Sequence, residues 1–509
     1  MNDRLHAVCD LMIPTVREMA GLHEYDGRVQ DLSPAGVRRG LSALAHARRG
    51  RTAPDGAREH HDDAHLSVFE ESLRVQYGEL ELHRRDPYLH LSNLELACYD
   101  REYAPREERA AARLKHLAQW PEAVDAAVTS LDRVSAPVAT ALLGAVRGLA
   151  AGLHPDQGPE AAAALPAHER LVAHVDRAAR TGDPDPRLGG EALAALMGSQ
   201  EGLPVDLTAL ADEAARERDR LTELLTESCR ALDPRRDIDE LIAELLADHP
   251  AADGVIPEAA RLTEEVIEFT RAKRLAPHLD GDCQVGPAPA SRRWAMAMMS
   301  WAAPGEPDAA SWYHVTPPEP EWPETEREEW LTVFSRTSLP SITVHEVAPG
   351  HFAHGRSLRR APTPVRRVLH SLSFCEGWAH YVEEVCLEEG FRARDPRFAI
   401  GVALEALVRV TRLSCAIGLH TGALTVDEAT ELFVRDAHLA RAGAASEARR
   451  GTFDAAYGRY TWGKLEIMRL REKARRDWGS GFSLERFHGA LLDLGSPPLG
   501  LIGAALTGA

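Results

Sequence analysis

Hydrophobic side chains recur every three or four positions along most of this chain, with charged and small residues between them. Alanine, leucine, arginine and glutamate fill these stretches, whereas runs of Val, Ile and Thr are few. This periodicity is typical of amphipathic helices, so it predicts a mainly α protein. With 509 residues, the chain is long enough for a large core and about two to four domain-sized units.

Residues 1–275 are expected to form a succession of helices that makes up one side of a cleft. Ser33 and Pro34 supply an N-cap and a first helical residue. A stretch rich in Gly, Pro and Asp over residues 181–186 predicts a turn. The expected helices cover residues 34–49, 60–82, 106–117, 120–130, 134–153, 159–181, 206–232 and 257–274.

Residues 276–509 are expected to form a second region, which opens with more Gly, Pro and Trp than the first. Short strands are expected over residues 293–301 and 311–315. Their edge could bind an extended peptide through main-chain hydrogen bonds, or they could form a purely structural hairpin, and the pattern leaves both open. Further helices are expected over residues 341–360, 365–389, 396–422, 425–438, 457–478 and 483–494.

The composition limits the kinds of partner. The chain is 44% hydrophobic and 27% charged with a net charge of −19, so we expect a globular protein that binds neither nucleic acid nor membranes. No stretch approaches 18 uncharged apolar residues, and residues 1–21 lack a signal peptide's apolar core, so a cytoplasmic location is expected. The seven cysteines are scattered, and Cys375 and Cys386 are expected to pack as small hydrophobic side chains.

The candidate chemistry lies in the sequence HEVAPGH at residues 345–351, followed 25 residues later by Glu376. Two imidazoles and one carboxylate are the usual protein ligands of a catalytic zinc, with the fourth position left to water. A carboxylate directly after the first histidine is where zinc hydrolases keep their general base. His345, His351 and Glu376 are therefore candidate ligands of one Zn²⁺ ion, and Glu346 is the candidate base.

The two histidines are further apart in sequence than those of the usual HExxH motif. In HExxH the histidines are about 40° apart around a helix, whereas residues six apart are about 240° apart, so a regular helix cannot aim both at one ion. Pro349 interrupts helical hydrogen bonding, and Gly350 tolerates unusual backbone angles. We therefore predict a bulge or kink at these two residues, in a helix that begins near Ser341 or Thr343.

Other histidines offer competing interpretations. His61 and His65 are spaced i and i+4 with Asp62 and Asp63 beside them, but neither an adjacent Glu nor a distant third ligand marks them as a metal site. A solvated helix face is therefore the favoured interpretation of these residues. His314 could reach the motif from its strand, although a single histidine there is more often structural.

The segments HEVAPGHFAHG and FCEGWAHYVEE resemble those of a bacterial family known as domain of unknown function 885, whose pattern is HExxPGH followed by EGWAxYxE. The resemblance continues in DGR at residues 26–28, YTWG at 460–463 and FHGALLDLGSPPL at 487–499, so it covers most of the chain. These proteins look like distant relatives of the gluzincin metallopeptidases. The resemblance implies a multi-helix, metallopeptidase-like fold with a small β-sheet beside a deep active-site cleft, and a His, His and Glu zinc ligand set.

The resemblance also suggests supporting residues. Tyr460 matches the family's tyrosine, and gluzincins commonly stabilise the oxyanion with Tyr or His, so Tyr460 is the first candidate and Tyr457 and His420 are the next. Glu383 matches a fixed acid that could bond a ligand histidine. His380 lies on nearly the same helix face as Glu376, which makes it another candidate neighbour of the metal.

Three further positions bear on the substrate. Arg459 and Lys464 flank Tyr460 and could hold a substrate carboxylate through charge-assisted hydrogen bonds, or could lie on a solvated face. The family's usual RLVVDTGLH is replaced by RLSCAIGLH at residues 412–420, so Ala416 occupies the aspartate position. If that aspartate orients a ligand or His420, its loss would cost about 10- to 100-fold.

These features predict a zinc-dependent hydrolase of the metallopeptidase type that cleaves a peptide or amide bond of a small peptide or conjugate. Glu346 would take the proton of the attacking water and pass it to the leaving amine. One alternative is a metal-dependent lyase or transferase acting on a non-peptide substrate. Another is a non-catalytic metal-binding protein, in which Glu346 would have no role. The substrate, endo- or exo-peptidase action and the oligomeric state stay open.

Overall fold

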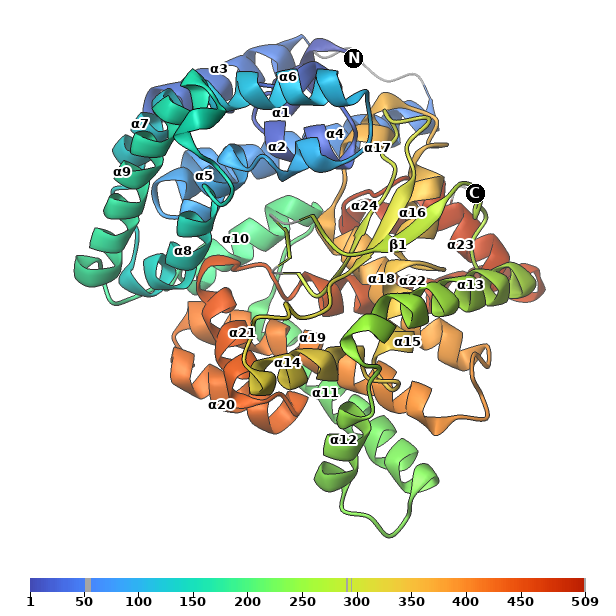
Figure 1. Ribbon diagram of the computed structural model, residues 1–509. Coiled ribbons are helices and arrows are strands. Elements are labelled where there is room, and N and C mark those ends of the chain that lie inside the picture. Colours follow the sequence, from blue (N-terminus) through green and yellow to red (C-terminus); the bar gives the residue numbers. More distant parts are fainter. Residues whose placement is uncertain (51–55, 290–291, 294, 508–509) are drawn as a thin grey trace.

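The computed structural model describes residues 1–50, 56–289, 292–293 and 295–507. Helices make up most of this part of the chain and are joined by one three-stranded sheet, so the prediction of a mainly α protein with a small sheet is confirmed. Figure 1 shows the N-terminal helices, blue to cyan, as an arc at the upper left of the remaining helices. No helix in the described ranges is both long enough and apolar enough to cross a membrane.

From residue 34 onward, the N-terminal arc contains the expected helices and one that was not expected, over Pro87–Leu94. Ser33 caps one of them by accepting a hydrogen bond from the Gly36 N–H, as predicted. The expected helix over residues 60–82 ends earlier, at Leu73, and continues as one wide π-helical turn. The helices are α1 Asp3–Cys9, α2 Ile13–Met19, α3 Pro34–Arg49, α4 Ala57–Leu73, α5 Pro87–Leu94, α6 Arg106–Leu117, α7 Trp120–Ser130, α8 Ala136–Gly148 and α9 Pro159–Thr181.

Four helices lead from the arc to the sheet. The Asp206 side chain caps the longest of them by accepting from the N–H groups of Thr208 and Ala209. Two of the four were not expected from the sequence. These helices are α10 Gly190–Glu201, α11 Leu207–Leu232, α12 Ile238–Ala247 and α13 Val255–Lys273, of which α10 and α12 are the unexpected ones.

The sheet contains β1 (Cys283–Gly286), β2 (Ala297–Ser300) and β3 (Ser311–Val315). Its strand order is β1-β3-β2, with β1 parallel and β2 antiparallel to the central β3. The two expected strands correspond to β2 and β3, apart from residue 294, which lies outside the described residues. β1 was not predicted from the sequence, because its parallel pairing with β3 depends on the fold.

The C-terminal half is again helical, and two expected helices are each divided in two. The helix over 341–360 becomes α15 and α16, and the one over 365–389 becomes α17 and α18. The first of these begins at Leu339, so neither Ser341 nor Thr343 is its N-cap. The helices are α14 Glu324–Leu331, α15 Leu339–Glu346, α16 His351–Leu358, α17 Pro364–Val368, α18 Leu372–Glu388, α19 Pro396–Thr421, α20 Val426–Ala437, α21 Arg441–Phe453, α22 Arg459–Trp478, α23 Leu484–Leu492 and α24 Leu499–Thr507.

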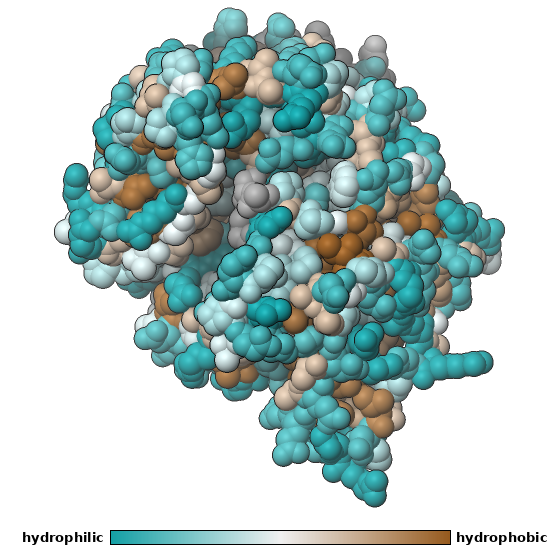
Figure 2. All heavy atoms as spheres, in the orientation of Figure 1, coloured by the Kyte–Doolittle hydropathy of each residue, from teal (hydrophilic) through white to brown (hydrophobic). Residues whose placement is uncertain are grey.

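The largest hydrophobic core runs from Leu193 to Leu506 and includes residues on both sides of position 275. The N-terminal arc has two further clusters, one over residues 94–175 and one over residues 5–77 that also includes Val365, Val368 and Leu369. The proposed division at residue 275 stays a prediction. Figure 2 shows a mostly hydrophilic face with hydrophobic side chains in small, separate patches, as expected for a chain of net charge −19.

Two glycines let α18 and α22 lie unusually close together. A Cβ atom on Gly377 would fall 2.5 Å from the backbone of Gly463, and one on Gly463 would fall 2.0 Å from the Ser373 carbonyl oxygen. Any larger side chain at either position would separate the helices. This contact brings Tyr460, on the first turn of α22, to the same pocket as Glu376 on α18.

Candidate metal centre

The chain between α15 and α16 takes up the two extra residues of the HEVAPGH sequence. The Gly350 N–H bonds to the Val344 carbonyl, and the Ala353 N–H bonds to the Val347 carbonyl, both at 3.2 Å. Each of these bonds joins residues six apart, in place of the four of a regular helix. The predicted irregularity is therefore confirmed, and it takes the form of a break between two helices.

Gly350 is needed at this break because the backbone closes on itself. A Cβ atom there would fall 1.9 Å from the carbonyl oxygen of His345. The Trp378 indole N–H donates to the Pro349 carbonyl at 3.0 Å and ties the break to α18. The tryptophan of the EGWA segment thus positions the segment that carries the two histidines.

The break brings His345, His351 and Glu376 together. The Nε2 atoms of His345 and His351 lie 3.5 Å and 3.3 Å from the same Glu376 oxygen. The imidazole rings are perpendicular, with centroids 4.8 Å apart. Within the described ranges, these residues form the one cluster of at least three His, Cys, Asp or Glu side chains whose potential ligand atoms all lie within 4.8 Å of one another.

Glu383, two turns after Glu376 on α18, supports this cluster. Its fully buried carboxylate accepts from His345 Nδ1 at 2.7 Å, from Ser341 Oγ at 3.2 Å and from Arg409 at 3.1 Å. Burial disfavours the imidazolium form of His345, but Glu376 and Glu383 outweigh it and raise the pKa of His345 to about 9. The Nδ1 bond leaves Nε2 of His345 as the nitrogen that faces Glu376.

Glu346 and Tyr460 line the same pocket as the three candidate ligands. The pocket has a volume of about 1640 Å³ and extends from β2 to the ends of α19, α21 and α22. The rings of Tyr460 and His345 are nearly parallel, with centroids 6.5 Å apart. The structure therefore brings the predicted base and the first oxyanion candidate to the predicted metal ligands.

Lys464 does not lie in this pocket, contrary to its predicted role. It is fully buried, and its ammonium group bonds to Glu217 at 2.8 Å and also to Glu384. Lys464 lies one helical turn after Tyr460, but its side chain is directed at carboxylates of α11 and α18 and not into the pocket. Lys464 is thus a member of a buried ion pair network and is not accessible to a substrate.

The two secondary candidates for oxyanion stabilisation are also engaged elsewhere. His420 lines the pocket, but its Nδ1 accepts from the Leu188 N–H at 3.1 Å and its Nε2 donates to the Gly451 carbonyl at 2.9 Å. Tyr457 is fully buried in a separate cluster on α19, α20 and α21, 3.4 Å from the Glu447 carbonyl. Neither side chain has the free polar group that a catalytic role requires.

His380, Arg459 and Ala416 differ in how close they lie to the candidate metal centre. His380 is buried with its Nδ1 3.7 Å from Glu383, which makes it a neighbour of the supporting carboxylate and not a contact of the metal cluster. Arg459 does line the pocket, where it pairs with Asp454. Ala416 is buried in the apolar cluster that contains Tyr457 and is not among the residues that line the pocket.

The competing histidines are not assembled into a metal site. Asp62 pairs with Arg366 and Asp63 pairs with Arg4, and these residues are not among the described His, Cys, Asp and Glu clusters that could hold a metal ion. Burial lowers the pKa of His61 to about 4. His314 bonds to the Pro287 carbonyl at 3.2 Å and is stacked on Trp312, away from the pocket lining.

Several arginines that line the pocket were not predicted from the sequence, and three of them lie close to the candidate site residues. Arg409, on α19, touches Glu383, whereas Arg412 and Arg450 lie near Tyr460. Arg412 and Arg409 are one turn apart on the same helix face, a spacing that could have drawn attention to them. Arg450 offered no such signal, because α21 was not expected at all.

Comparison of the chain with known proteins identifies its family but assigns no activity. Residues 14–506 match the family described as "Bacterial protein of unknown function (DUF885)". No curated protein matches the chain. Two solved structures share its fold. A "putative lipoprotein of unknown function" from Shewanella oneidensis has a TM-score of 0.81 at 21% identity, covering 98% of this chain and 97% of its own. A "putative lipoprotein" from Colwellia psychrerythraea has a TM-score of 0.78 at 16% identity, covering 100% and 99%. This chain therefore belongs to the bacterial family DUF885.

Proposed function

We propose that this protein is a zinc-dependent hydrolase of the metallopeptidase type, acting on a peptide or amide bond. The observation that carries the proposal is the placement of two imidazole nitrogens 3.5 Å and 3.3 Å from one carboxylate oxygen. Ligand atoms at about 2.0–2.1 Å from a tetrahedral zinc are about 3.3–3.4 Å apart, close to both of these separations, and this agreement supports the proposal. His345, His351 and Glu376 would hold the ion.

The hydrogen bonding of the candidate ligand His345 is also typical of zinc sites. Ligand histidines usually donate their second ring N–H to a carboxylate, and Glu383 accepts that bond from His345. When bound, zinc supplies a Lewis acid that polarises a substrate carbonyl and lowers the pKa of water. The likeness to gluzincins is part of this proposal and rests on the same residues.

The remaining chemistry falls to Glu346 and Tyr460. Glu346 is only 9% exposed, and it lines the pocket directly after the first ligand histidine. It accepts the proton of the attacking water and delivers it to the leaving nitrogen. The Tyr460 phenol donates a hydrogen bond to the oxyanion that forms on the substrate carbonyl. A small peptide or amide conjugate is the proposed substrate.

The proposal is tested first by the metal content of the purified protein and of its Glu376→Ala variant. We expect one equivalent of zinc in the parent protein and its loss in the variant. Glu389→Ala, at the end of the same helix, is the matched control and should keep the metal. A parent protein that stays metal-free after zinc addition would overturn the proposal.

Catalysis is tested separately with Glu346→Gln, which should keep zinc and lose hydrolysis. A panel of peptides, other amides and non-peptide substrates distinguishes a hydrolase from a lyase or transferase on the same site. Metal-loaded protein that converts none of these compounds would favour a binding protein instead.

The cytoplasmic location is also a proposal. The two similar structures are both called lipoproteins, which is a statement about those proteins and favours the cell envelope as the competing location. Fractionation of the native host, followed by detection of the protein, distinguishes the two locations.

A further inference from the structure

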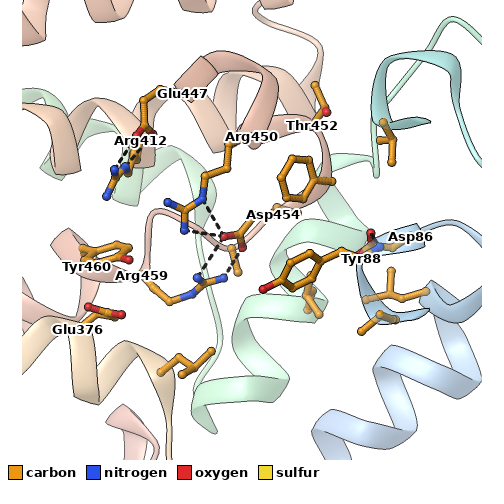
Figure 3. A pocket seen from close by; sticks show the side chains of 18 of the residues that line it. Asp86, Tyr88, Glu376, Arg412, Glu447, Arg450, Thr452, Asp454, Arg459 and Tyr460 are labelled. Carbon is orange, nitrogen blue, oxygen red and sulfur yellow. Dashed lines mark hydrogen bonds and ion pairs between the residues drawn. The ribbon is translucent and has the colours of Figure 1, made fainter. Parts of the chain in front are cut away.

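A group of three arginines and two carboxylates forms one wall of the pocket (Figure 3). Arg412 comes from α19, Arg450 from α21 and Arg459 from the start of α22. Glu447 and Asp454 are the carboxylates that accompany them. The chain as a whole has a net charge of −19, so three arginines grouped in one part of the pocket lining stand out from the overall charge.

Two of the arginines are each matched by one carboxylate. Arg412 donates to both oxygens of Glu447, at 2.8 Å and 2.6 Å. Arg459 donates through both terminal nitrogens to Asp454. These two-point pairs hold the guanidinium groups in fixed orientations and neutralise them.

Arg450 is the third arginine and has no carboxylate of its own. It shares Asp454 with Arg459, through bonds of 3.3 Å and 3.0 Å to one oxygen. No described residue accepts a hydrogen bond from its Nη1 group. Its side chain is 32% exposed, against 15% for Arg412 and 16% for Arg459. Among these five side chains, three guanidinium groups are therefore matched by two carboxylates, and Arg450 is the arginine that is most exposed on the pocket side.

Tyr460 connects this wall to the candidate metal centre. The Arg412 guanidinium lies over the Tyr460 ring, 5.2 Å from its centre, and the ring is 6.5 Å from that of His345. Figure 3 shows Tyr460 between Arg412 and Glu376. An extended residue spans about 3.3–3.6 Å, so these two steps place Arg412 within roughly three residues of a bound peptide from His345.

We propose that Arg450, held between Arg412 and Arg459, binds the free C-terminal carboxylate of the substrate. The inference rests on the proposed function and deepens it, because it makes the enzyme an exopeptidase that acts at C-terminal ends. Arginine is suited to this role because its planar fork matches a carboxylate at two points. A peptide whose C-terminus is amidated would place a neutral group against the charge.

Direct binding tests the inference without relying on hydrolysis. Acetyl-alanyl-phenylalanine and its C-terminal amide are titrated by calorimetry into protein stripped of metal with a chelator. We expect the free acid to bind at least tenfold more tightly than the amide. Arg450→Gln should remove this preference, because it leaves Glu447 paired with Arg412 and Asp454 paired with Arg459. Arg450→Lys, which keeps the charge but not the fork, should retain part of it.

Arg449→Gln is the matched control, since Arg449 is the neighbouring arginine of α21 and is exposed. It should leave the preference unchanged. Equal binding of acid and amide by the parent protein, or a preference that survives in a correctly folded Arg450→Gln variant, would overturn the inference. Hydrolysis without a preference for the acid would refute the inference alone. A preference without any hydrolysis would refute the proposed function and leave the carboxylate site standing.

Discussion

The carboxylate of Glu383 accepts a hydrogen bond from the Nδ1 atom of His345 at 2.7 Å, and the two side chains are both buried. This bond sets the imidazole so that Nε2 faces Glu376. An ionised carboxylate accepts a hydrogen bond more strongly than an amide does, so the strength of the bond to His345 depends on the charge of Glu383.

Replacing Glu383 with Gln should therefore weaken zinc binding by about 10- to 100-fold, since the histidine loses its orienting partner. Zinc affinity would be measured by competition with a chromophoric chelator. Glu389→Gln should leave the affinity unchanged. Unaltered zinc affinity in a folded Glu383→Gln protein would mean that the bond is only structural.

The two tyrosines near the start of α22 should respond differently to loss of their hydroxyl groups. Tyr460 lines the pocket beside His345, whereas Tyr457 is fully buried in an apolar cluster. Tyr460→Phe should lower kcat by about 10²- to 10³-fold with zinc retained, as expected for loss of an oxyanion donor. Tyr457→Phe should keep kcat. The same kcat in both variants would contradict the assignment.

Lys464 should matter for folding rather than for substrate. Its buried ammonium is the common partner of Glu217 and Glu384, so removing it leaves two buried carboxylates with less compensation. Lys464→Ala should lower the free energy of unfolding by about 3–5 kcal/mol, measured by urea denaturation. Lys473→Ala, at an exposed position of the same helix, should change it by no more than about 0.5 kcal/mol. Similar losses in both variants would refute a buried ion pair.

The protein should lose stability in mild acid because several histidines are buried in the neutral form. Burial lowers the pKa of His90, His420 and His488 to about 4 in each case. Between the unfolded pKa of about 6.5 and this folded value, the unfolded chain binds more protons than the folded one. The stability that these histidines contribute is therefore fully present above about pH 6.5 and is lost as the pH falls toward 4. Each histidine should cost about 2 kcal/mol by pH 5.

Urea unfolding at pH 7 and pH 5, followed by tryptophan fluorescence, measures this loss. His488→Gln should be less stable than the parent at pH 7 but should lose less on going to pH 5. His46→Gln, at an exposed position, should follow the parent at both values. Equal stability of the parent at pH 7 and pH 5 would show that these histidines are not buried neutral in solution.

Much of this protein could be predicted from local signals in the sequence. Ser33, Asp206 and Thr425 each cap the helix that was expected to follow them, because a side-chain cap needs only the backbone two or three residues away. The break at Pro349 and Gly350 followed from helix geometry alone. The candidate ligands His345, His351 and Glu376 came from residue type, order and spacing.

Contacts between distant segments could not be predicted in this way. Lys464 and His420 were placed near a substrate from their positions in the chain, yet Lys464 turns toward Glu217, and His420 toward Leu188 and Gly451. The sequence by itself thus determined the helical class, the caps and the candidate metal ligands, which depend on neighbours along the chain. Only the tertiary structure decided which polar side chains face the pocket, because that depends on helix rotation and on partners hundreds of residues away. The arginine wall of α19, α21 and α22 is the clearest example.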